Sequence, residues 1–229
     1  MSIQSLRTLI CSVLLCTAFY ANAQFNIKVG YNGNYADFKK TADIFNRFSD
    51  QFSSDDQKLK PPKIYHGIEF GARYKFSEYF GVDVGISSTN GQSKVTGLSS
   101  QTSELVDSEW KISHSNLYLG LENYVGSYGY GATLGYQRLK YTNKTNLNSE
   151  SLEILKQNAL NSKFYLIFEY ASSVNSFSFR PFVTINWQPY NFHTVELAIF
   201  PDTKLPITDY DEDLMVFGIS LIIYNGPQK

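Results

Sequence analysis

Apolar and polar residues alternate strictly in a series of segments along the chain, and this pattern restricts the fold more than any other feature. In the first such segment, Phe25, Ile27 and Val29 alternate with polar residues and glycine. Successive side chains of a β-strand point to opposite faces, so each segment predicts a strand with one apolar and one polar face. The predicted strands cover residues 25–32, 67–76, 80–87, 117–122, 128–137, 164–170, 177–188 and 215–223.

The fourth of these strands contains a change of phase. Leu117 and Leu119 share one face, whereas Trp110 and Ile112 before them stand in the opposite phase. One extra residue in a strand reverses the alternation on either side of it. We therefore predict a β-bulge near Ser113–Asn116.

The connections between the strands alternate in length. Short turns follow the second, fourth and sixth strands, and long links follow the first, third, fifth and seventh. Outer-membrane barrels place short turns in the periplasm and long loops outside the cell. The pattern predicts an all-β fold, an eight-stranded antiparallel up-and-down transmembrane β-barrel in the outer membrane, with both termini on the periplasmic side.

A soluble barrel of the lipocalin kind is the alternative fold. It would turn its large apolar face inward, around a ligand. Here the polar face carries glycine, small residues and a few charges, which suits the inside of a narrow barrel. The pattern therefore favours a barrel whose apolar face contacts membrane lipid.

The composition agrees with a membrane barrel and excludes other classes. Aromatic residues make up 16% of the chain, and barrels use them as girdles at the two membrane interfaces. The 20 Lys and Arg nearly balance the 21 Asp and Glu, so no basic field would attract nucleic acid. The mean hydropathy of -0.25 excludes a bundle of membrane-spanning helices.

Residues 1–23 have the features of a secretory signal peptide. Arg7 precedes a short apolar run, and Ala21 and Ala23 place small residues at a cleavage site before Gln24. The run is too short to span a membrane, which takes about 20 apolar residues. The predicted organisation is a signal peptide over 1–23 and an outer-membrane barrel over 24–229.

Both cysteines lie within this first segment. Cys11 follows Ile10 and Cys16 follows Leu15, so neither follows the small residue expected before a lipid-modified cysteine. Cleavage before Gln24 would leave no cysteine in the remaining chain. A disulfide framework and a thiolate metal site are then both excluded.

Six charged residues fall on the predicted inward face of the barrel. An eight-stranded barrel is just filled by its inward side chains, and charges buried there must be paired. We predict that Arg73 and Arg180 form an ion-pair network that closes the lumen, with a selective pore or a proton-linked path as the alternative. The six residues are Glu69, Arg73, Asp83, Glu122, Glu169 and Arg180.

The first long link, residues 36–63, contains a candidate helix. Thr41 is its expected N-cap, and four apolar residues follow at helical spacing. The helix is expected either to cover the barrel rim or to bind a partner protein. The four apolar residues are Ile44, Phe45, Phe48 and Phe52.

The third link contains a second candidate helix, with the same two interpretations. Ser149 is its expected cap, with Glu150 and Glu153 in its first turns. A stripe of apolar residues at helical spacing would form its packed face. The stripe consists of Leu152, Leu155 and Ala159, with Ile154 beside it.

The fourth link combines an alternating stretch with an acidic stretch. Val195, Leu197 and Ile199 alternate, which predicts a short hairpin outside the membrane. The acidic residues at 209–213 either form a solvated rim or bind a divalent cation through their oxygen atoms. They lack the spacing and the glycine of a calcium-binding loop, so no metal site is predicted.

The histidines give little support for catalysis. A lipid A-modifying enzyme needs a histidine with a serine nucleophile or a carboxylate partner. Ser113 and Ser115 are adjacent to His114, and neighbours along a strand face opposite sides. The other histidines are His66 and His193, and His193 lies with Glu196 in a link that has no evident nucleophile. The sequence predicts no catalytic residue and no cofactor.

Three stretches carry a resemblance to a known family. They are Ala21-Asn22-Ala23-Gln24, the strand Gly67-x-x-x-Gly71-x-Arg73-Tyr74 and the restart at Phe80-Gly81-Val82. Together they resemble the PorT-like outer-membrane β-barrel proteins of Bacteroidota, over most of residues 24–229. The resemblance implies an eight-stranded barrel without catalytic residues, and a structural or accessory role in a surface, secretion or assembly complex. A small passive pore and a lipid A-modifying enzyme are the alternatives.

Overall fold

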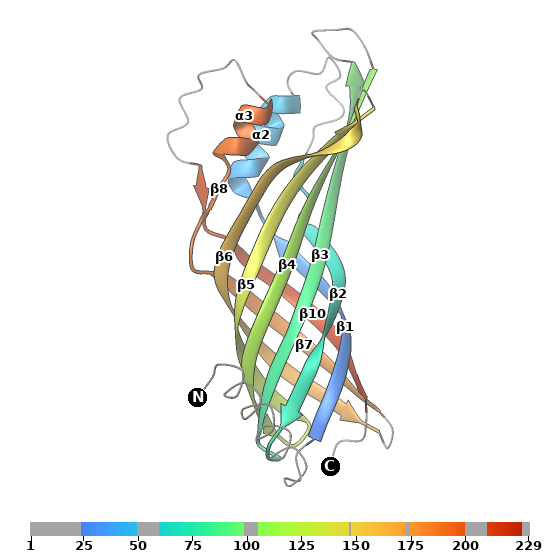
Figure 1. The fold of residues 1–229 in the computed structure, drawn as a ribbon, viewed down its shortest axis with the longest axis vertical. Coiled ribbons are helices and arrows are strands. Elements are labelled where there is room, and N and C mark those ends of the chain that lie inside the picture. The colour runs from blue at the N-terminus through green and yellow to red at the C-terminus, as the bar shows by residue number, and fades with distance from the viewer. Residues whose placement is uncertain are drawn as a thin grey trace, which may run out of the picture.

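Eight long antiparallel strands form a closed barrel in the computed structural model, which describes residues 24–49, 60–98, 105–146, 148–172, 175–199 and 210–225. Neighbours in the chain are neighbours in the sheet, and the first and last strands pair to close the ring (Figure 1). The predicted fold class is confirmed. The strands are β1 (Gln24–Ala36), β2 (Ile64–Lys75), β3 (Phe80–Leu98), β4 (Leu105–Val125), β5 (Tyr128–Thr145), β6 (Asn148–Ala171), β7 (Asn175–Asn186) and β10 (Met215–Asn225).

The outer surface of the barrel is apolar on every strand. On β4, for example, Leu117, Leu119 and Leu121 are exposed at 58%, 59% and 68%. The alternate residues of the same stretch, such as Tyr118 and Glu122, are buried in the interior. The alternation read from the sequence is therefore the alternation between the outside and the inside of the barrel.

The four central strands extend far beyond the others at one end of the barrel (Figure 1). We call this extension the fin, comprising residues 91–98 of β3, 105–113 of β4, 139–145 of β5 and 148–160 of β6. Strands β3 and β4 pair as far as Leu98 and Leu105, and β5 and β6 as far as Thr145 and Asn148. The links after the third and fifth strands are therefore shorter than predicted.

The helix predicted over the third link is wrong, because those residues belong to β6. Leu155 is paired with Tyr141 and Ala159 with Gln137, and both side chains are buried. A spacing of four residues fits one face of a helix and also one face of a strand. Pairing with β5 decides between the two.

The predicted bulge near Ser113–Asn116 is also wrong. Strand β4 pairs without a register shift with both β3 and β5. Trp110 and Ile112 point into the same interior as Tyr118, because that interior changes from polar to apolar toward the fin. The register shifts that do occur lie between β5 and β6, near Tyr141–Thr142 and Asn143–Thr145.

Two short helices fill the mouth of the barrel beside the fin. They are α2 (Lys39–Ser49) and α3 (His193–Ile199), and a two-stranded pairing of β8 (Tyr190–Asn191) with β9 (Asp211–Glu212) flanks α3. The hairpin predicted around Val195 is therefore wrong, because the stretch is helical. Val195 is fully buried and Leu197 is exposed, as on the two faces of a helix.

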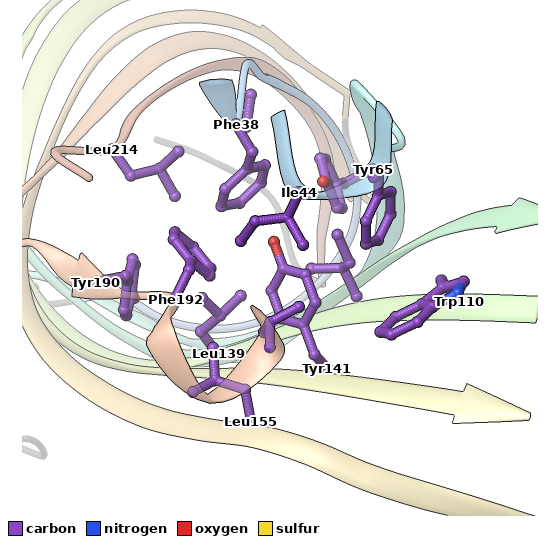
Figure 2. Close-up of a cluster of buried hydrophobic side chains, with 14 of the residues drawn as sticks. Phe38, Ile44, Tyr65, Trp110, Leu139, Tyr141, Leu155, Tyr190, Phe192 and Leu214 are labelled. Atoms are coloured by element: carbon purple, nitrogen blue, oxygen red, sulfur yellow. The ribbon is translucent and has the colours of Figure 1, made fainter. Parts of the chain in front are cut away.

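The helices close the mouth with a compact apolar core, which we call the cap. Figure 2 shows Phe38, Ile44 and Phe192 directed toward Tyr141 and Leu139 of the barrel wall. The Phe38 ring lies 5.9 Å from the ring of Phe192 and 6.2 Å from that of Tyr141, edge to face in both pairs. This arrangement favours the interpretation of α2 as a lid.

The predicted helix in the first link is confirmed, but its predicted N-cap is wrong. The helix begins at Lys39, so Thr41 lies inside it, where its hydroxyl is 3.2 Å from the Tyr141 hydroxyl. Glu212 of β9 accepts hydrogen bonds from the amides of Lys39 and Lys40. A distant carboxylate therefore takes the place of the local cap.

Some predictions fall outside the described residues. These are the signal peptide of residues 1–23, residue Phe52, Asp209 of the acidic stretch, and the side chains of Phe48, Ser149 and Ile199. Within the described ranges, no helix is long and apolar enough to cross a membrane.

Candidate functional site: a closed lumen

A buried lysine organises one half of the barrel interior. The Lys28 Nζ atom of β1 lies 2.8 Å from Glu69 Oε1 of β2 and 2.5 Å from Asp83 Oδ1 of β3. Arg180 of β7 reaches the same group from across the lumen, with its Nη1 atom 3.1 Å from Asp83 Oδ2 and 2.6 Å from Glu122 Oε1. Asp83 thus bridges two cations.

A second cluster lies around Arg73 of β2. Its two terminal nitrogens donate to the two carboxylate oxygens of Glu169 of β6, at 3.0 and 3.1 Å. This bidentate geometry is the strong form of a guanidinium–carboxylate pair. The Lys75 Nζ atom lies 3.6 Å from the same carboxylate.

Inward-facing tyrosines link the two clusters. The hydroxyls of Tyr124 and Tyr165 both donate to Glu122, the latter at 2.9 Å. The Tyr224 ring lies under the Arg73 guanidinium at 3.6 Å, and its hydroxyl accepts a hydrogen bond from Arg180. These contacts satisfy charged groups that have no access to water.

Glycines opposite the tyrosines create the room for these rings. Gly85 is paired with Tyr118 and Gly131 with Tyr165. A Cβ atom at Gly85 would lie 2.5 Å from the Tyr118 hydroxyl, and one at Gly131 would lie 2.5 Å from the Tyr165 ring. The glycines on the polar face of the strands therefore accommodate large neighbours.

The structure places all six sequence-predicted residues in the interior, each at most 8% exposed. Ion pairs join Arg73 to Glu169, and Arg180 to Asp83 and Glu122. Glu69 instead pairs with Lys28, a residue that the sequence analysis did not select. We call these seven residues the plug: Lys28, Glu69, Arg73, Asp83, Glu122, Glu169 and Arg180.

Sequence reasoning also missed the lysine and tyrosine side chains that complete the plug. Lys163 contributes another cation, 3.8 Å from Glu69 Oε2, and the Tyr118 hydroxyl donates to Glu69 Oε1 at 2.5 Å. Tyr118 lies on the polar face of the predicted strand 117–122, and Lys163 continues the inward face of the predicted strand 164–170 by one residue. Their length and polar tips let them reach across a narrow lumen.

A small polar cavity separates the plug from the cap. Its volume is about 40 Å³, and its lining combines amides, hydroxyls, His114 and Lys163 with a few apolar side chains. A space of this size holds only one or a few water molecules. Two closed layers, one ionic and one apolar, therefore fill the barrel from the plug to the mouth.

The histidines contact amide and aromatic groups. His114 Nδ1 lies 2.8 Å from Gln137 Nε2, and its ring is packed against Tyr65 and Phe38. The His66 ring stacks on Tyr31, and the His193 ring lies 4.6 Å from that of Tyr210. In the described part of the chain, the three rings therefore pack against amide and aromatic groups.

The acidic stretch of the fourth link serves the cap. Burial raises the pKa of the Glu212 carboxyl above its ordinary value, and the amides of Lys39 and Lys40 oppose that rise. Asp211 accepts a hydrogen bond from Asn191 at 2.7 Å. Within the described residues, no three or more histidine, cysteine or acidic side chains converge as metal ligands.

These features define a class of protein: a closed eight-stranded antiparallel barrel with an apolar outside and a filled, charged inside. No protein-family model matches the chain, and no curated protein matches it. Solved structures of similar fold exist.

Three of them illustrate the range. The attachment invasion locus protein Ail of Yersinia pestis, solved with the heparin analogue sucrose octasulfate, is 16% identical, with 89% of this chain and 97% of that chain covered and a TM-score of 0.45. OprG of Pseudomonas aeruginosa is 13% identical, with 89% and 95% covered and a TM-score of 0.43. Neisserial surface protein A is 9% identical, with 89% and 98% covered and a TM-score of 0.40.

Proposed function

We propose that this chain is a non-enzymatic outer-membrane β-barrel that acts as a structural or accessory subunit at the cell surface. The observation that carries the proposal is the inverted polarity of the barrel. Large apolar side chains are exposed on all eight strands, whereas Lys28, Arg73 and Arg180 are at most 2% exposed inside. Soluble monomers rarely expose apolar patches above a few hundred Å².

The side of the membrane follows from the ends of the barrel. The short turns at residues 76–79 and 126–127, and the facing ends of β6 at Ala171 and β7 at Asn175, lie at the end opposite to the fin and the cap. Outer-membrane barrels turn their short connections to the periplasm, so the fin and the cap belong outside the cell. Delivery there is attributed to the signal peptide of residues 1–23, cleaved before Gln24.

The closed lumen favours an accessory role over transport. A pore needs a continuous polar path, and here the plug and the cap both lie across it. The extended fin offers a large outer surface instead, and binding residues concentrate on segments that a rigid scaffold holds out into solvent. The resemblance to PorT-like barrels, some of which assist secretion or assembly complexes, points to the same role.

A mild-detergent pull-down of the tagged, full-length protein with mass spectrometry tests the accessory role. The proposal predicts a stoichiometric protein partner that is lost when fin residues 139–160 are replaced by a short turn. A folded barrel that is recovered alone, with and without the fin, contradicts it.

A further inference from the structure

A band of basic residues borders the apolar outer surface over β4, β5 and β6. Strand pairing sorts the outward side chains into rows. Moving from the middle of the barrel toward the fin, the rows change from apolar to polar to cationic. Three consecutive rows are Leu117–Tyr136–Leu160, Ser115–Arg138–Asn158 and Ser113–Lys140–Lys156.

The cations in this band outnumber the carboxylates. Lys140 and Lys156 stand directly opposite each other on neighbouring strands, and such like-charge pairs destabilise a sheet. Arg138 lies in the next row, where its Nε donates to Asn158 at 3.2 Å. With Lys111 of β4 they form what we call the basic patch. Glu153 faces it, 2.7 Å from the Lys140 Nζ atom.

An apolar hollow adjoins the basic patch on the side of the barrel middle. It has a volume of about 450 Å³, and Arg138 forms part of its edge. Ser88 and Ser115 lie along the same wall, and the rest of the lining is largely apolar, including Ile68, Phe70, Ile86, Leu117 and Tyr136. One surface therefore offers an apolar hollow with positive charge at one end.

In the rows nearest the hollow, the cations lie on β5 and β6. On the adjoining strand β3, the same two polar rows contain Ser88 and Asn90, which are neutral. A ring of basic residues that only marks the membrane boundary would not need this difference in charge between β3 and the strands β5 and β6. Four cations beside one hollow fit a ligand that has both an anionic head and an apolar tail.

We propose that the basic patch and the hollow bind a phosphate-bearing lipid of the outer leaflet. The proposal rests on the membrane location inferred above. An acyl chain lies in the hollow, and the phosphate lies over Arg138, Lys140 and Lys156. A guanidinium binds phosphate through two parallel hydrogen bonds, and the lysines add point charges. The negative phosphate would also reduce the repulsion between the two lysine side chains.

Titration of the purified full-length protein in a neutral detergent with bisphosphorylated lipid A tests this site. A variant with R138Q, K140Q and K156Q keeps the outer face polar and is expected to bind at least about tenfold more weakly. The matched control carries K94Q and K144Q, which remove two cations farther out on the fin that adjoin Glu109. It is expected to bind within about twofold of the wild type.

Dephosphorylated lipid A provides the second arm. The wild type is expected to bind it as weakly as the triple variant binds the phosphorylated lipid. Equal affinity of the wild type for both lipids, or equal affinity of the triple variant and the wild type for phosphorylated lipid A, overturns the site. Heat-modifiable gel mobility after insertion into phosphatidylcholine vesicles separates the lipid site from the proposed membrane location. A chain that inserts but binds the two forms of lipid A equally refutes the lipid site alone. A chain that never inserts refutes both proposals.

Discussion

Arg180 illustrates how single residues hold charge inside this barrel. It lies between Asp83 and Glu122, with its side chain 3% exposed, and it also donates to Tyr224. Replacing a whole buried ion pair by apolar groups can be neutral, but removing one partner leaves an uncompensated charge. The contacts of the plug are therefore needed together.

Arg180→Met is expected to destabilise the barrel by about 3 kcal/mol or more, because Asp83 and Glu122 lose a shared cation. Urea unfolding of the protein in lipid vesicles measures the change. Lys94→Met is the matched control, since Lys94 forms an ion pair with Glu109 while 67% exposed, and it is expected to cost less than about 1 kcal/mol. Similar losses for the two variants would contradict a buried, mutually dependent plug.

Gly131→Val tests the fit between glycines and inward tyrosines. The added side chain meets the Tyr165 ring, so the variant is expected to lose about 2 kcal/mol or more of unfolding free energy. Gly33→Val, where a Cβ meets only Ile219 at 3.8 Å, is expected to be nearly neutral. Combining Gly131→Val with Tyr165→Ala should cost less than the sum of the two, and strict additivity would count against the steric account.

The alternation of apolar and polar residues alone placed the six charges of the predicted network on the inward face of the strands. It did not indicate which cation meets which carboxylate, because that depends on strand register and on reach across the lumen. Lys28 shows the limit: it stands on the polar face in the sequence, yet only the register of β1 with β2 and of β2 with β3 brings it between Glu69 and Asp83.

Among the elements, α2 is held by side chains that also belong to the barrel wall. Ile44 and Phe45 are at most 2% exposed, in the same cluster as Trp110 and Tyr141. The helix thus depends on the fin for its apolar partners. Strand pairing in the barrel does not depend on the helix.

Ile44→Asp is expected to detach α2 without unfolding the barrel. A buried unpaired carboxylate opposes docking, so protease cleavage within residues 39–49 should rise on the order of tenfold or more. Asn46→Asp places the same charge on the exposed face of the helix and should leave cleavage unchanged. Loss of heat-modifiable mobility in Ile44→Asp would mean instead that the cap supports the whole barrel.

The alternation pattern predicts the strands well where their outer face is apolar, a zone we call the apolar belt. It predicts the elements beyond this zone less well. Inside the belt, one face meets lipid and the other a polar lumen, which produces strict alternation. Beyond it, the inner face becomes apolar where it packs against the cap. The apolar Trp110 and Ile112 therefore mimic a change of phase in β4. The spacing of Leu155 and Ala159 in β6 likewise mimics that of a helix. The alternation of Val195, Leu197 and Ile199 predicts a strand, but the segment is too short for its periodicity to distinguish a strand from the helix α3 that it forms.

In the whole molecule, two successive layers of side chains, the plug and the cap, close the lumen of the barrel. The plug holds charged groups from β1, β2, β3, β4, β6 and β7 in contact across the lumen. The cap then fills the mouth with apolar side chains. Either layer alone is a barrier to ions, since each offers no continuous water-filled path.

Conductance across a planar lipid bilayer tests this claim most directly. The inserted wild-type protein is expected to show no stable single-channel steps. A variant lacking α2 is expected to stay closed as well, because the plug remains. Stable, ohmic single-channel steps from the wild-type protein would contradict the closed lumen and favour a pore.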